Sequence, residues 1–234
     1  MKNRVDVFLV HGVGKLLKAD YYDNFVKAIR DELPIDFDLN FHPIDYSYLL
    51  QEKEETIFGW MKDMGWDKLR EFGCNFVCDV LAYGYPKAKA TQGDFVYDVT
   101  QLLDLKFNEV AKRYPESKKV IIGHSLGSII SFGYSWEFPI NCLITLGSPF
   151  LYFSIRYKDF GKNNPNLPLF YNFWKYYDPI STKVSRNPNF STVKDIQVKT
   201  FNPKYILPMQ AHTNGYWKSN FVHKEIAKII SSLE

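Results

Sequence analysis

One five-residue motif, Gly123-His124-Ser125-Leu126-Gly127, has the residue types and spacing of a serine nucleophile held in a tight turn. It follows the apolar run Val120-Ile121-Ile122 and precedes small and apolar residues, so a short strand should enter the turn and a helix should leave it. Serine is a weak nucleophile unless a base can reach its hydroxyl, and a strand–turn–helix context exposes the hydroxyl in this way. The glycines two residues before and two residues after Ser125 would let the neighbouring backbone approach closely.

A second motif, His11-Gly12-Val13-Gly14, follows Val5-Asp6-Val7-Phe8-Leu9-Val10, a second candidate for a buried strand near the start of the chain. Backbone amides in a glycine-rich turn after an early strand can point at a carbonyl oxygen that becomes negative during acyl transfer. The expected donors are the amide of Val13 and the amide of Leu126, the residue after the serine. The histidine is expected to be structural here, and the glycines to permit the turn. The alternative reading is an ordinary turn from strand to loop.

An aspartate and a histidine follow the serine in the chain order Ser, Asp, His that one class of serine hydrolases uses. Asp178 comes after the aromatic run 169–177, which is expected to be a strand, and the proline turn behind it would hold the carboxylate at the strand end. Asp178 is preferred to Asp159 and Asp195 because only Asp178 follows a strand end at this place in the order.

The histidine expected to act as base is His212, in a loop between a last predicted strand, 196–201, and a last predicted helix near 221–233. A loop position lets an imidazole reach the serine hydroxyl. The ring of His124, inside the serine motif, is expected to point away from the serine and to pack or hydrogen-bond nearby. The remaining histidines are assigned to structure or surface: His11, His42 and His223.

The apolar patterns place these residues on alternating strands and helices. Such alternation predicts a parallel sheet with helices on both faces. Residues 150–168, rich in Asn and Pro, are expected to be irregular. The predicted strands are 5–10, about 38–46, 120–122, 141–146, 169–177 and 196–201, and the predicted helices are about 20–33, 95–113, the stretch after the serine motif to about 136, and 221–233.

Together these motifs resemble those of small α/β-hydrolases, the superfamily of lipases, esterases and thioesterases. The resemblance extends from residue 5 to the last helix. It rests on His11-Gly12, Gly123-His124-Ser125-Leu126-Gly127, Leu146-Gly147-Ser148-Pro149, Tyr177-Asp178-Pro179, and His212 with Tyr216-Trp217. It implies that Ser125 is the nucleophile, His212 the general base and Asp178 the orienting acid. The oxyanion hole would then be formed by the amides of Val13 and Leu126.

The resemblance also implies a fold, a three-layer α/β/α sandwich with a mostly parallel sheet. The chain starts at what would be the strand before the oxyanion turn, so a minimal form that lacks the first strands of the α/β-hydrolase fold is expected. A single domain, 1–234, is expected, with a lid or cap insertion around 49–93. Within it, the apolar residues of 55–85 are expected to form either two core-packed helices or a wall for an acyl chain, and their mixed charges argue against adsorption to a membrane.

The implied reaction is cleavage of a carboxylic ester or thioester through an acyl-serine, on a small-molecule or lipid-like substrate. No cofactor and no metal are expected, because no cluster of His, Asp and Glu has ligand spacing. Two alternatives stay open: an acyltransferase that uses the same three side chains, and a binding protein that kept the fold without the chemistry. The complete set of side chains argues against the second.

The composition fits a globular enzyme and excludes a nucleic-acid-binding surface. The net charge is only +3, and no basic run alternates with aromatic residues. The three cysteines make no even disulfide framework, and Val5–Val10 is too short for a signal peptide or a membrane span. A cytoplasmic location is therefore expected.

Overall fold

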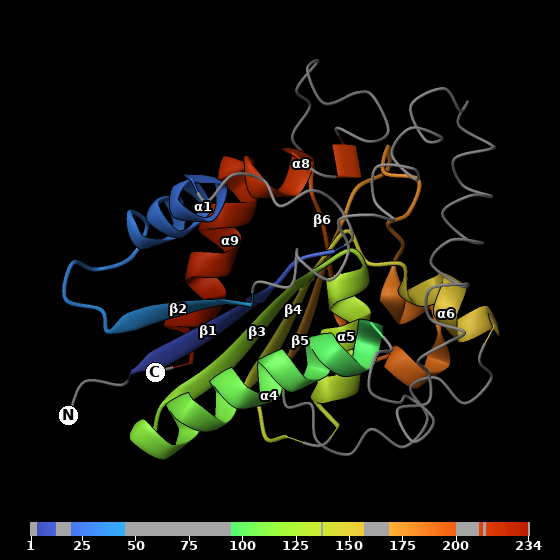
Figure 1. Ribbon diagram of the computed structural model, residues 1–234. Helices are drawn as coiled ribbons and strands as arrows, with labels where there is room; N and C mark the ends of the chain where they lie inside the picture. Colours follow the sequence, from blue (N-terminus) through green and yellow to red (C-terminus); the bar gives the residue numbers. More distant parts are fainter. Residues whose placement is uncertain are drawn as a thin grey trace.

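The computed structural model describes residues 4–12, 20–44, 95–136, 138–156, 169–199, 211–212 and 214–233. The strands in these ranges form one six-stranded sheet in the order β2-β1-β3-β4-β5-β6, and every neighbouring pair is parallel. Helices cover both faces, which confirms the predicted three-layer α/β/α arrangement (Figure 1). The strands are β1 (Val5–Val10), β2 (Leu39–Ile44), β3 (Lys118–His124), β4 (Cys142–Leu146), β5 (Phe170–Trp174) and β6 (Lys194–Gln197).

Strands β1, β3 and β4 are buried on both faces, because helices cover both sides of the sheet. Consecutive side chains of a strand point to opposite sides, so each strand contributes to two cores. In β1, Val5, Val7 and Leu9 belong to one hydrophobic core, whereas Phe8 and Val10 belong to the other. This explains why β1, β3 and β4 are mostly apolar in the sequence, although β1 also buries Asp6 and β3 also buries Lys119. The first core includes α1 (Asp20–Arg30) and α9 (Asn220–Ser231), and the second includes α4 (Phe95–Arg113) and α5 (Leu126–Tyr134).

The helices that cover these cores show the apolar spacing expected of amphipathic helices. In α4, Val99, Leu103, Phe107 and Val110 recur every three or four residues and are buried. Ser219 precedes helix α9, and its side chain caps the helix by accepting a hydrogen bond from the amide of Val222.

Helix α5 is buried on almost every side and packs against β1, β3 and β4. The closest approach is at Gly127, where a Cβ atom would lie 2.2 Å from the carbonyl oxygen of His11 and 2.3 Å from that of Val10. Both are backbone atoms at the end of a buried strand, so neither can move aside as a flexible side chain could. Residue 127 therefore has to be glycine for the helix to lie this close to the sheet.

We expect Gly127→Ala to destabilise the protein by at least about 3 kcal/mol or to prevent folding, because the helix and the strand would have to separate. Gly133→Ala in the same helix is the matched control, since a Cβ there meets nothing within 4 Å. Replacing that glycine should raise the free energy of unfolding by up to about 1 kcal/mol. Denaturant unfolding measures both, and equal stability of the two variants would contradict the close contact.

Three predicted elements differ from those observed. Phe150–Arg156, predicted to be irregular, forms helix α6, because Phe150 and Phe153 lie one turn apart and both insert into the core. The last strand, β6, begins and ends earlier than the predicted strand 196–201, which it overlaps at 196–197. It pairs with β5 at the sheet edge, and its polar first residues lie outside the alternating pattern. The segment around His212, predicted as a loop, has helical residues at 211–212, followed by α8 (Asn214–Trp217).

The bounds of other elements differ by a few residues. Helix α5 ends at Tyr134 rather than near 136, and β5 ends at Trp174, so Asp178 lies in the turn after the strand. Residues 49–93, where a lid insertion is predicted, lie outside the described residues, and so do Val13 and Gly14. In the part of the chain that is described, no helix is both long and apolar enough to cross a membrane.

Candidate active site

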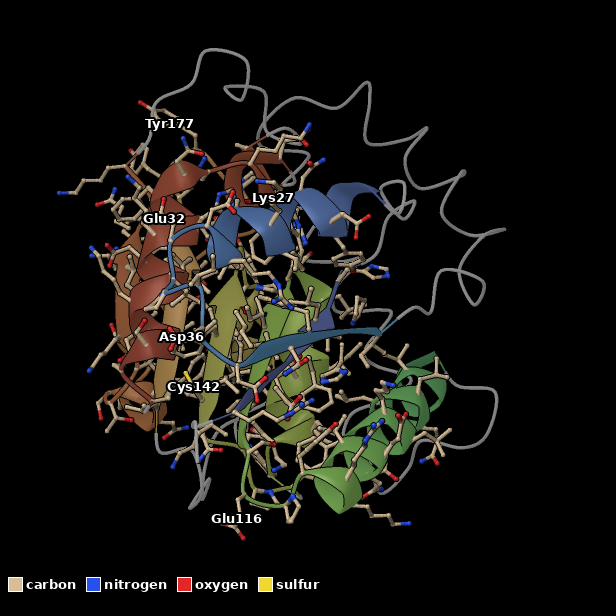
Figure 2. All side chains as sticks on the ribbon, turned by 90° about the vertical axis from the view of Figure 1, so that its left-hand side faces the viewer. Lys27, Glu32, Asp36, Glu116, Cys142 and Tyr177 are labelled. Atoms are coloured by element: carbon tan, nitrogen blue, oxygen red, sulfur yellow. The ribbon has the colours of Figure 1, made fainter. Side chains whose placement is uncertain are left out.

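The candidate residues gather at one edge of the sheet because the carboxyl ends of parallel strands meet there. Figure 2 shows this polarity: Tyr177, which follows β5, lies at the upper end of the molecule, and Glu116, which precedes β3, lies at the lower end. The turn with His11 and Gly12 follows β1, and Ser125 follows β3. Residues far apart in the sequence thus share one end of the molecule.

Ser125 is the one non-glycine residue among those described that has a positive φ, with φ 53° and ψ −125°. Such a conformation costs about 1–3 kcal/mol and persists only where the surroundings impose it. Here the amide of Ser125 donates to the carbonyl of Leu146 at 2.9 Å, and its carbonyl accepts from the amide of Ser128 at 3.0 Å. The Ser128 hydroxyl donates to the same carbonyl. The strained turn is therefore fixed on both sides of the serine.

The side chains of Ser125, His212 and Asp178 form one hydrogen-bonded chain. Nε2 of His212 lies 2.8 Å from Oγ of Ser125, and Nδ1 lies 2.9 Å from Oδ2 and 3.1 Å from Oδ1 of Asp178. All three residues are buried, with exposed fractions of 7% for Ser125, 4% for His212 and 2% for Asp178. A carboxylate can only accept, so Nδ1 carries a proton and Nε2 can accept the serine proton.

Asp178 is held as an anion by a full set of donors. Burial on its own would raise the pKa of Asp178. The charge and hydrogen bond of His212, with hydrogen bonds from Ile180 and Tyr216, outweigh burial and lower that pKa below its ordinary value. Oδ1 accepts from the amides of Ile180 at 2.9 Å and Ser181 at 3.2 Å, and Oδ2 accepts from the hydroxyl of Tyr216 at 2.8 Å.

His124 faces His212 and not the serine beside it in sequence. Its Nε2 lies 2.9 Å from the main-chain carbonyl oxygen of His212. Burial, followed by the neighbouring His212, lowers the pKa of His124 to about 3, so the ring is neutral at neutral pH. Because the carbonyl can only accept, Nε2 of His124 must carry the proton and donate it. The residue before the serine therefore anchors the backbone of the histidine that faces the serine.

Gly147, which follows β4, packs against the side chains of Tyr216, Asp178 and His212. It has φ +60°, a conformation that side-chain-bearing residues rarely adopt. A Cβ at this position would lie 2.9 Å from Cε2 of Tyr216, 3.1 Å from Oδ2 of Asp178 and 3.2 Å from Cε1 of His212. A side chain here would push these groups apart, so glycine permits their close packing.

Of the remaining predicted residues, Gly12, Leu126 and His11 are among the described residues, whereas Val13 is not. Gly12 packs directly on the serine, since a Cβ there would lie 2.5 Å from Cβ of Ser125. Leu126 is the first residue of α5, and its amide has no carbonyl partner within the helix. His11 is buried beside Gly12. The other predicted amide donor, Val13, lies outside the described residues.

The sequence predicts no role in the site for several residues that the structure places there. Tyr216 and Gly147 belong only to the motifs that carry the family resemblance, and no role was predicted for the amides of Ile180 and Ser181. The sequence feature that could have indicated Tyr216 is a tyrosine four positions after His212, because the hydroxyl of a buried tyrosine needs a hydrogen-bond partner. Among the described residues, no group of three or more His, Cys, Asp and Glu side chains is placed to hold a metal ion.

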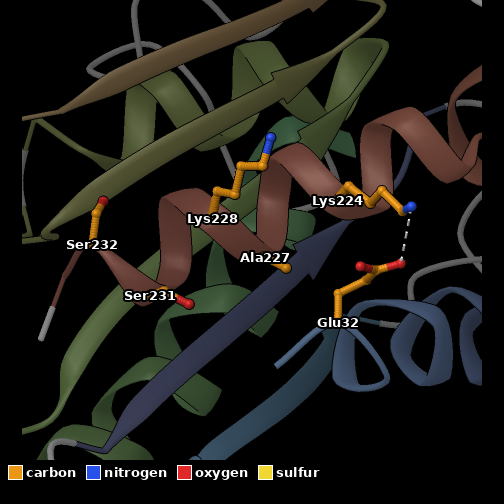
Figure 3. A pocket seen from close by; sticks show the side chains of 6 residues that line it. All are labelled: Glu32, Lys224, Ala227, Lys228, Ser231 and Ser232. Carbon is orange, nitrogen blue, oxygen red and sulfur yellow. Dashed lines mark ion pairs between the residues drawn. The ribbon is translucent and has the colours of Figure 1, made fainter. Parts of the chain in front are cut away.

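A separate surface hollow of about 460 Å³ lies beside α9 (Figure 3). Its ion pair joins Lys224 to Glu32 at 4.0 Å, and its other polar groups are surface lysine and serine side chains. It contains none of the residues that surround Ser125. The lining residues are Glu32, Lys224, Ala227, Lys228, Ser231 and Ser232. The chemistry therefore belongs to the strand-end site and not to this hollow.

Comparison with known proteins identifies the fold but no close relative. No family model matches this sequence, and no curated protein matches it. A Xanthomonas campestris pv. campestris protein assigned to the alpha/beta hydrolase superfamily is 13% identical with a TM-score of 0.53, over 98% of this chain and 99% of that chain. The Pyrococcus furiosus esterase Pf2001 is 12% identical with a TM-score of 0.52, over 98% and 83%. Esterase PE8 is 11% identical with a TM-score of 0.50, over 91% and 93%. These likenesses show that the chain has the α/β-hydrolase fold.

Proposed function

We propose that this protein is a serine hydrolase that cleaves carboxylic ester or thioester bonds through an acyl-serine intermediate. The observation that carries the proposal is the continuous chain of hydrogen bonds from Oγ of Ser125 through His212 to Asp178. The strained backbone at Ser125 adds support, because strain of this kind concentrates at functional sites. Two of the proteins that share the fold are esterases by name, and this favours the same reaction class.

The proposed reaction begins with Ser125 attacking the carbonyl carbon of the ester while Nε2 of His212 takes the hydroxyl proton. The tetrahedral intermediate collapses, the bond from carbon to the leaving oxygen or sulfur breaks, and His212 gives that atom the proton. Water then attacks the acyl-serine and loses a proton to His212. The bond from carbon to Oγ breaks, Oγ recovers the proton, and the carboxylic acid leaves. Asp178 stays ionised throughout and stabilises the imidazolium.

The negative oxygen of the tetrahedral intermediate needs donors that are already in place. We assign this role to the amide of Leu126, at the start of α5, and to the amide of Val13. The helix start favours negative charge, because unpaired amides and the helix dipole both point toward it. Gly12, packed on Ser125, would leave the room that this oxygen requires.

The proposal is tested by treating the purified protein with a fluorophosphonate and measuring its intact mass. A single adduct on Ser125 is expected. The untreated protein should hydrolyse p-nitrophenyl esters and acyl thioesters, and the phosphonylated protein should not. A folded protein that takes up no adduct and cleaves none of these substrates would refute the proposed function. Product analysis with added alcohols, amines and thiols separates hydrolysis from acyl transfer.

The anchoring contact of His124 gives a prediction of its own. His124→Gln keeps an N–H donor for the carbonyl of His212, so it should retain most of the labelling rate of Ser125. His124→Leu removes the donor, frees the backbone of His212, and should lower this rate by about 10- to 100-fold. Both labelling rates are measured by quenching the reaction at successive times and determining the intact mass. Equal rates for the two variants would show that the contact does not position the base.

A further inference from the structure

Tyr216 touches the site but has no part in the reaction proposed above. It lies on α8, is 0% exposed, and donates its hydroxyl to Oδ2 of Asp178 at 2.8 Å. Burial, followed by the charge of Asp178, raises the pKa of Tyr216 well above its usual value. The hydroxyl is therefore protonated at every pH at which the protein would work. Toward the carboxylate it is therefore a steady donor, and its own oxygen can still accept a hydrogen bond.

The donors on Asp178 divide between its two oxygens in a way that gives Tyr216 a distinct task. Oδ1 is fixed by the backbone amides of Ile180 and Ser181, which no side-chain change can remove. Oδ2 lies nearest to Nδ1 of His212, and Tyr216 is the other group among the described residues that donates to it. Without the phenol hydroxyl, the described contacts would leave the imidazole alone to hold the oxygen that orients it.

The ring of Tyr216 is held as firmly as its hydroxyl. Gly147 lies so close that a Cβ there would be 2.9 Å from the ring. The ammonium of Lys175 lies 5.7 Å from the ring centre. His124 packs on it with ring centres 6.1 Å apart. A ring fixed between such neighbours delivers its hydroxyl to one place.

We propose that Tyr216 is a positioning residue of this site, whose hydroxyl fixes Oδ2 of Asp178 in front of Nδ1 of His212. The inference rests on the proposed function, because it assigns Tyr216 a role only if His212 acts as the base. It adds a fourth side chain to the chain of Ser125, His212 and Asp178.

The role predicts a change in pH dependence whose sign follows from the geometry. A donor to Asp178 stabilises the anionic form of the Asp178–His212 pair, so its loss makes the pair take up a proton at higher pH. The described titratable groups around the pair are His124, which is neutral, Lys175, whose pKa is lowered by burial, Tyr216 itself and, beyond His124, His11. The acidic limb of the activity profile should therefore report the pair.

The experiment measures the rate at which a fluorophosphonate labels Ser125, by intact mass, between pH 4 and pH 9. For Tyr216→Phe we expect the acidic limb to move up by about 0.5 to 1 pH unit and the plateau rate to fall about 3- to 10-fold. Tyr134→Phe is the matched control, since Tyr134 is also buried and its hydroxyl lies on Asp104, away from the site. It should leave the limb in place.

A second variant works in the opposite direction and remains informative if Tyr216→Phe does not fold. Placing 3-fluorotyrosine at position 216 keeps the ring and makes the hydroxyl a stronger donor, so the limb should move down. An unchanged limb in either folded variant, or an equal shift in Tyr134→Phe, would overturn the inference alone. A wild-type protein that is never labelled would overturn the proposed function and the inference with it.

Discussion

Ser125→Ala is expected to abolish fluorophosphonate labelling and to lower ester hydrolysis by about 10⁴- to 10⁶-fold. The variant removes the oxygen that lies 2.8 Å from Nε2 of His212 and leaves the rest of the site in place. Alanine has to adopt the same strained backbone as serine. The loss of one hydrogen bond should therefore change the free energy of unfolding by only about 1 kcal/mol.

The control for this variant is another buried serine at the end of the same helix. Ser135 is 1% exposed, and its hydroxyl donates to the carbonyl of Phe132, far from His212 in the hydrogen-bond network. Ser135→Ala should keep the labelling and the hydrolysis of the wild-type protein. If Ser125→Ala still forms the adduct, a different residue carries the nucleophile and the proposed mechanism is wrong.

Asp178→Asn is expected to lower the rate of hydrolysis by about 10³- to 10⁴-fold while the protein stays folded. The reason lies in the way the backbone orients the new amide. The amides of Ile180 and Ser181 demand an acceptor, so the asparagine oxygen must take the place of Oδ1. Its NH₂ group then faces Nδ1 of His212, and the imidazole is held in the tautomer whose Nε2 carries a proton.

An imidazole in that tautomer cannot accept the proton of Ser125, which accounts for the size of the expected loss. Asp104→Asn on α4 is the matched control, because Asp104 accepts hydrogen bonds from Asn108 and Tyr134 and none from the site. Steady-state hydrolysis of the best ester found by screening measures both variants. More than about a tenth of wild-type activity in Asp178→Asn would mean that another acid orients His212.

The sequence was most informative where a local pattern coincides with a strand end. Three side chains that the fold brings together, those of Ser125, Asp178 and His212, follow from motif spacing and chain order, because parallel strands end at one edge. The rejected acid Asp195 shows the value of that rule. It lies within β6 and accepts from the amides of Val184 and Ser185, where it stabilises a short 3₁₀ helix.

What the sequence did not reveal depends on contacts between segments that are distant in the chain. The bond from His124 to the carbonyl of His212 joins residues 88 positions apart, and no local pattern encodes it. The role of the Tyr216 hydroxyl depends on its contact with Asp178, which is distant in the sequence. Helix α6 was hidden by the Asn- and Pro-rich stretch that follows it, and the start of β6 was missed because an edge strand can be polar. Tertiary packing decided each of these cases.

The position of β1 between β2 and β3 in the sheet has a consequence for synthesis of the protein on the ribosome. One edge of β1 pairs with β3, whose first paired residue, Lys118, is made about 110 residues after Val5. Until then an almost wholly apolar strand has a single partner strand at most, and its open edge can pair with another chain. Slower translation or a chaperone acting on this interval should raise the yield of active protein more than any change made after β3 has emerged.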